Sequence, residues 1–93
     1  MDKIIIGEKT FEGYAIPTSK ASLLLIRANK GMLGCGYLKV ETADKIGDVL
    51  AVVTGVNSYD DMLKAKVVGA SAAARALGVK EGISGEEALM LMS

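Results

Sequence analysis

Five consecutive apolar residues, Val49 to Val53, are the feature of this chain that most restricts its fold. A strand with one face in water alternates apolar and polar side chains, whereas an unbroken apolar run is typical of a strand covered on both faces. Thr54 and Gly55 end the run. The sequence therefore predicts a buried strand over Val49–Thr54, inside a domain that has helices as well as strands.

The N-terminal half has the pattern of strands separated by turns. Apolar runs bounded by Gly, Pro, Asn and Lys predict four strands, at Lys3–Ile6, Thr10–Ile16, Ser22–Ala28 and Met32–Val40. Gly31 closes the turn before the fourth run and is able to take a positive φ. Gly34 and Gly36 lie inside that run and predict a bulge or a close backbone approach.

The C-terminal half reads as short helices around the buried strand. The predicted pieces are a helix at Ala43–Ile46 capped by Thr42 and ended by Gly47, a helix from Ser58 to about Ala65, a brief strand at Val67-Val68, a helix at Ala70–Leu77, and a last helix from Gly85 to Met92. Ser84 and Glu87 have the spacing of a capping box before the last helix.

Composition restricts assembly and partners. Apolar residues and glycine together make up about 59% of the 93 residues, against roughly 45–50% in an average soluble domain. A single domain of this size, residues 1–93, has difficulty burying so much apolar surface, which favours a homo-oligomer. The alternative is a core rich in small residues. With 11 basic and 11 acidic residues and no basic stripe, nucleic-acid binding is not expected.

The same composition predicts a location. No apolar stretch approaches the roughly 20 residues that span a bilayer, so no membrane segment is expected. The N-terminal residues contain too short an apolar run for a signal peptide. A single cysteine forms no internal disulfide, which fits a reducing compartment, and we expect the protein in the cytoplasm.

The absence of histidine removes most catalytic arrangements, because no Ser-His or Cys-His pair and no histidine metal site can form within the chain. We expect no metal and no cofactor. Cys35 is the remaining candidate nucleophile, between Gly34 and Gly36, whose amides are open to a ligand. The alternative is that Cys35 is a small core residue.

A second candidate site follows the buried strand, at Thr54, Gly55, Asn57 and Ser58. A strand end, a glycine and a helix start are typical of ligand sites in α/β proteins, and free amides there attract anions. In the alternative interpretation Gly55 only turns the chain and Ser58 only caps the helix. The chain has no Walker loop and no Gly-x-Gly-x-x-Gly sequence.

Three segments resemble one family. They are Leu77–Leu89, with the sequence LGVKEGISGEEAL, together with Cys35-Gly36-Tyr37-Leu38 and Ala51–Val56. In order and spacing they are similar to the YunC-like proteins, small prokaryotic proteins with a domain of unknown function, over roughly the last two-thirds of the chain. The resemblance implies a two-layer α/β sandwich with a mixed sheet, and it supplies no activity. It marks Cys35, Gly36, Gly55, Gly82 and Gly85 as positions for turns, close approaches or a site.

These observations lead to a functional hypothesis. We expect a non-catalytic, homo-oligomeric module that binds a small anionic metabolite through Gly34, Gly36, Thr54, Gly55, Asn57 and Ser58. The alternatives are a cysteine-dependent enzyme that uses Cys35 with a base from a neighbouring subunit, and a purely structural or partner-binding subunit.

Overall fold

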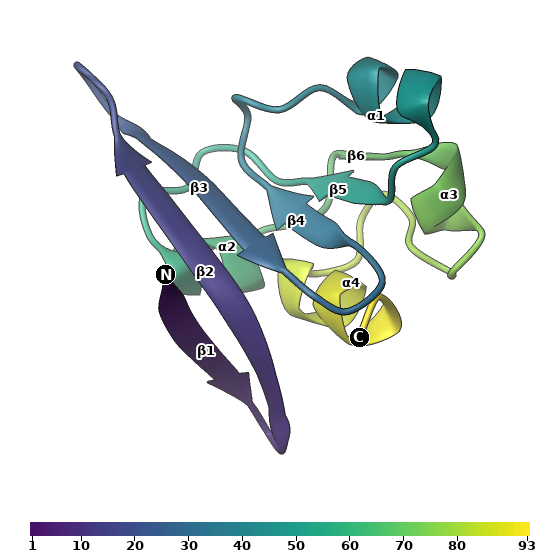
Figure 1. Cartoon of the computed structure of the whole chain (residues 1–93), viewed down its shortest axis with the longest axis horizontal. Helices are drawn as coiled ribbons and strands as arrows, with labels where there is room; N and C mark the ends of the chain where they lie inside the picture. The colour runs from purple at the N-terminus through teal and green to yellow at the C-terminus, as the bar shows by residue number, and fades with distance from the viewer.

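A computed structural model describes all residues from 1 to 93 and has one six-stranded sheet with four short helices (Figure 1). The strands lie side by side in chain order from β1 to β6. Their bounds are β1 Asp2–Ile6, β2 Lys9–Pro17, β3 Ser22–Arg27, β4 Met32–Gly34, β5 Leu50–Val52 and β6 Gly69–Ala70; the helices are α1 Val40–Ile46, α2 Tyr59–Lys64, α3 Ala72–Arg75 and α4 Gly85–Leu91. This mixed α+β architecture agrees with the predicted fold class.

The sheet is antiparallel except for one parallel pair of strands. Strands β1 to β4 form an antiparallel meander, β4 and β5 run parallel, and β5 and β6 are antiparallel. A parallel pair needs a crossover connection, and α1 supplies it between β4 and β5. The carboxyl ends of β4 and β5 therefore meet at the same edge of the molecule.

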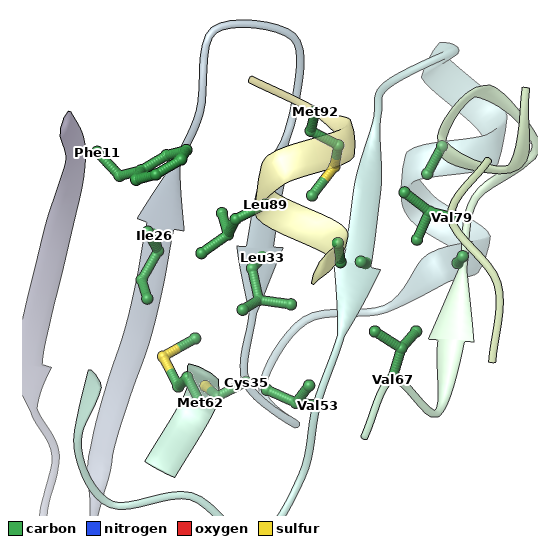
Figure 2. Packing of buried hydrophobic residues seen from close by; sticks show 14 of the residues in the cluster. Phe11, Ile26, Leu33, Cys35, Val53, Met62, Val67, Val79, Leu89 and Met92 are labelled. Carbon is green, nitrogen blue, oxygen red and sulfur yellow. The ribbon is translucent and has the colours of Figure 1, made fainter. Parts of the chain in front are cut away.

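The prediction that β5 is covered on both faces is confirmed by the packing. Ala51 and Val53 belong to a cluster of 15 buried residues that α2 and α4 cover, whereas Leu50 and Val52 pack with Ala43 of α1 on the opposite face. Figure 2 shows Leu89 of α4 among the strand residues of the main cluster. The helices are thus divided between the two faces, and α1 is separate from the main helical layer.

The fourth predicted strand, Met32–Val40, is too long. Strand β4 ends at Gly34 because the carbonyl of Cys35 accepts the N–H of Leu38 at 3.0 Å, which turns the chain out of the sheet. Val40 then belongs to α1, so the expectation that Thr42 caps this helix is also wrong. Its N-cap is Lys39, with no side-chain cap, and Gly47 ends it with a φ of 76° as predicted.

Three further predictions differ from the structure in detail. The brief strand is β6, two residues after the predicted Val67-Val68, and Lys66 forms an isolated bridge to Ser84. Helix α3 is shorter than Ala70–Leu77, because Ser71 caps it and Ala70 pairs with β5. Gly31 has no positive φ; a Cβ there would overlap Val49 and Met92.

The helix starts at Ser58 and Ser84 are confirmed. The hydroxyl of each serine accepts the amide N–H three residues later, and Glu87 completes the capping box of α4. No helix of the chain combines the length and the apolar character that crossing a membrane requires.

Candidate functional site

A cavity of about 360 Å³ opens at the carboxyl ends of β4 and β5. The chain leaves β4 through the turn at 35–38 and leaves β5 through the loop 53–58, and the start of β3 forms the third side. Ligands of α/β proteins commonly bind beyond the carboxyl ends of parallel strands. The eight lining residues are Ala21, Ser22, Cys35, Gly36, Tyr37, Gly55, Val56 and Asn57.

Two segments that the sequence marked as separate candidates thus meet in one cavity. Cys35 and Gly36 come from the end of β4, and Gly55 and Asn57 come from the loop after β5. Eighteen residues lie between Gly36 and Gly55 in the sequence, and the parallel pairing of the two strands brings them together.

The other three predicted site residues do not line the cavity. Gly34 lies within β4, where Leu38 occupies the space that a side chain would need. Ser58 caps α2 by accepting the N–H of Asp61 at 3.1 Å. Thr54 is exposed and is not among the lining residues, although its methyl group would be 3.4 Å from a Cβ on Gly36.

Sequence reasoning missed four lining residues. Tyr37 directly follows Gly36, so extending that segment by one position would have found it, and Val56 lies inside the predicted loop between Gly55 and Asn57. Ala21 and Ser22 belong to the hairpin between β2 and β3, and only the β3–β4 pairing places them beside Cys35. No local signal in the sequence predicts that placement.

Cys35 is held in the wall of the cavity by its neighbours in β3. The residue is only 5% exposed and belongs to the main core cluster (Figure 2). Its N–H donates to the carbonyl of Leu24 at 3.1 Å, and the N–H of Leu24 donates to Sγ of Cys35 at 3.3 Å. In a regular ladder the carbonyl of residue 35 would accept that second bond, but Leu38 occupies it. The thiol therefore completes the ladder where the strand ends.

The loop after β5 is fixed by its own hydrogen bonds. Gly55 has a φ of 71°, a conformation that other residues rarely adopt. The carboxylate of Asp61 accepts the N–H of Asn57 at 3.0 Å, so this amide is not free for a ligand. The Asn57 side chain remains on the cavity wall.

Four other backbone N–H groups at the cavity have no hydrogen-bond acceptor within the chain. They belong to Gly36, Tyr37, Gly55 and Val56. Amide donors without a partner are uncommon unless water or a ligand satisfies them. These amides are available as donors to a ligand with oxygen acceptors.

No acidic or basic side chain lines the cavity. Its polar side chains are Ser22, Cys35, Tyr37 and Asn57, and the Tyr37 hydroxyl donates to Oγ1 of Thr18 at 3.0 Å. No group of three or more Asp, Glu or Cys side chains that could hold a metal ion occurs anywhere in the chain. The arrangement within one chain supports binding through neutral donors, and it places no general base beside the thiol.

Comparison with known proteins places this geometry in a family. Residues 34–92 match the domain of unknown function DUF1805, a segment that begins at the end of β4 and includes most of the cavity wall. The uncharacterized protein YunC of Bacillus subtilis (strain 168) is 31% identical over 93 residues, which cover 96% of this chain and 92% of YunC.

A solved structure extends the similarity to the fold. The crystal structure of TA1206 from Thermoplasma acidophilum, a protein of unknown function, is 39% identical and has a TM-score of 0.93, covering 99% of this chain and 90% of TA1206. The chain belongs to the DUF1805 family and is YunC-like, as the sequence segments predicted.

Proposed function

We propose that this protein is a binding module for a small anionic metabolite, held in the cavity at the carboxyl ends of β4 and β5. The observation that carries the proposal is the group of unpaired amides at Gly36, Tyr37, Gly55 and Val56, in a cavity that no carboxylate lines. Successive backbone N–H groups bind carboxylate and phosphate oxygens without a charged side chain. The cavity volume lies in the range of small-ligand sites.

The proposal includes self-association in the cytoplasm. Hydrophobic residues make up 51% of the chain, yet only 22 of 93 residues are buried. Apolar surface that remains exposed in one copy is a driving force for assembly. The single free thiol is suited to a reducing compartment.

A thermal-shift screen with small carboxylates and phosphates tests the binding function. A ligand at 100 times its Kd stabilises a protein by about 2.7 kcal/mol, which raises the Tm of a domain this size by about 10 °C or more. Hits are then measured by calorimetry. A broad panel that leaves the Tm unchanged contradicts the proposal.

Two variants at one position locate the binding site. Gly36→Leu fills the cavity and is expected to abolish the shift, whereas Gly36→Ala retains it, because a Cβ at Gly36 meets only the Thr54 methyl at an ordinary contact distance. Equal shifts for both variants would place the ligand elsewhere on the protein.

A further inference from the structure

The face of the sheet opposite α2 and α4 is largely uncovered. Residues that pair directly across strands share a face, so the row Lys3, Glu12, Arg27, Met32 and Leu50 lies on the side where α1 packs. The next row on this side begins with Tyr14 and Leu25. In Figure 1, β2 and β3 pass in front of α2, and no helix lies in front of β1 to β3. We call the β1–β4 part of this side the open face.

The open face has apolar side chains beside a row of charges. Ile5 of β1 is 71% exposed and Ile16 of β2 is 57% exposed, while Tyr14, Leu25 and Met32 are partly exposed between them. At one edge stands α1, whose last residue, Ile46, is 73% exposed beside Met32 in an apolar groove of about 330 Å³.

The strands of the open face supply part of a standard interface. Their 5, 9, 6 and 3 residues, at about 3.4 Å each on strands about 4.8 Å apart, give a footprint of about 380 Å². A standard interface buries about 800 Å² per partner, so the contact also takes in the groove beside α1.

The order of residues across the strands identifies the occupant as a second copy. A two-fold axis that runs along the strands, midway between β2 and β3, places β2 over the partner's β3 and β1 over the partner's β4. Tyr14 then faces the partner's Leu25, and the reverse contact follows by symmetry. In the charged row, Arg27 faces the partner's Glu12, so opposite charges meet twice.

The same axis places β1 over the partner's β4. Lys3 then faces the partner's Met32, Ile5 lies two residues farther along β1, and α1 forms a rim along the edge of the partner's sheet. Within one chain Arg27 and Glu12 are already 3.7 Å apart, so the assembly extends an existing ion pair into a four-residue network. Equal numbers of acidic and basic residues leave no net charge to oppose association of two copies.

We infer that the protein forms a two-fold symmetric dimer through the open face, with the axis between β2 and β3. This inference rests on the self-association proposed above and assigns the surface that carries it. The ligand cavity is a separate feature, and the groove beside α1 shares only Tyr37 with its lining.

Light scattering and sedimentation of five proteins test the dimer. The wild type is expected at twice the chain mass of 9.7 kDa. Ile16→Glu and Arg27→Glu are each expected to raise the dimer Kd at least about tenfold, since each places an unmatched charge in the contact. The double variant Glu12→Arg/Arg27→Glu restores opposite pairs and is expected within a few-fold of wild type. Val68→Glu is the matched control, because Val68 is half exposed beside β6 at the far edge of the sheet.

The possible results distinguish a failure of the open face from a failure of self-association as a whole. A monomeric wild type overturns both and leaves the ligand proposal standing. An assembled wild type whose mass is unchanged by Ile16→Glu and Arg27→Glu overturns the face alone. If circular dichroism shows that Ile16→Glu is unfolded, the charge pair decides: dissociation by Arg27→Glu with rescue by the double variant supports the face, and loss without rescue overturns it.

Discussion

Tyr59 joins the first turn of α2 to the first strand by one side-chain contact. Its hydroxyl donates to Oδ2 of Asp2 at 2.7 Å, and its ring lies over Gly13, where a Cβ would be 2.8 Å from the ring. Partial burial of the phenol, then the hydrogen bond to Asp2 and its negative charge, raise the pKa of Tyr59 to about 12. The neutral phenol is therefore favoured by the fold.

This pKa predicts a loss of stability at high pH. Unfolded tyrosine titrates near pH 10, so the contribution of Tyr59 is complete below that pH and is lost as the pH rises from about 10 to 12. Urea unfolding from pH 8 to 12 should show a steeper alkaline decline for wild type than for Tyr59→Phe. Asp2→Asn removes the charge beside Tyr59 and should make the alkaline decline in stability smaller than in wild type. Parallel curves for wild type and Tyr59→Phe would contradict this assignment.

At the scale of single residues, the sequence predicted which positions are unusual better than it predicted the contacts that make them unusual. Cys35 and Gly31 were both marked correctly as unusual positions. The role of each depends on residues far along the chain: Leu24 for the thiol, and Val49 with Met92 for the glycine. Local patterns contain no information about such partners, so the turn at Gly31 was predicted correctly, but glycine is required there by a close approach and not by a positive φ.

Helices α2 and α4 cross at Gly85, the first residue of α4. A Cβ at this position would overlap the carbonyl oxygen of Met62 and lie 2.9 Å from Cδ2 of Leu33. Because the first obstacle is backbone, it cannot move aside as a flexible side chain does. The N–H of Gly85 also donates to Ala65 at 2.8 Å, which fixes the start of α4 against the end of α2.

Replacing Gly85 by alanine should therefore separate the two helices. We expect Gly85→Ala to lower the free energy of unfolding by about 3 kcal/mol or more. Gly82→Ala is the control: its φ of 94° is strained for alanine, but nothing lies within 4 Å of the new atom, so about 1–2 kcal/mol is expected. Chemical denaturation measures both. Equal losses would contradict the helix crossing as the reason for glycine at position 85, because Gly85 has no positive φ and the loss at Gly82 comes from backbone strain alone.

Elements with a local signal were predicted correctly, and those without one were not. The capping serines, the glycine after α1 and the apolar run of β5 each act within a few residues. Strands β4 and β6 are short because other contacts end them. Strand β4 ends at the turn that includes Cys35, and β6 ends where Ser71 caps α3. The candidate site was half predicted for the same reason, since the pairing of β4 with β5 joins its two segments.

The two halves of the molecule are held together at the C-terminal end of the chain. The carbonyl of Met92 accepts the N–H of Lys30 at 2.7 Å, and its sulfur lies against Gly31 in the turn between β3 and β4. Met92 is fully buried in the main cluster, as Leu89 is (Figure 2). The antiparallel meander and the helical layer therefore share one core, and loss of this contact affects both.

Two methionines near this end provide a matched test. Met92 is buried, whereas Met90, two positions earlier, is 40% exposed. Met92→Ala should lower the free energy of unfolding by about 2–5 kcal/mol, because it removes buried area and leaves a cavity between α4 and the hairpin. Met90→Ala should change it by no more than about 0.5 kcal/mol, as expected for a surface substitution. Urea unfolding followed by circular dichroism gives both values.

A domain of 93 residues has only about 5–14 kcal/mol of stability to lose, so Met92→Ala should also populate the unfolded state measurably near body temperature. If the two variants unfold at the same urea concentration, the C-terminal end does not join the halves, and the meander and the helices are stabilised separately.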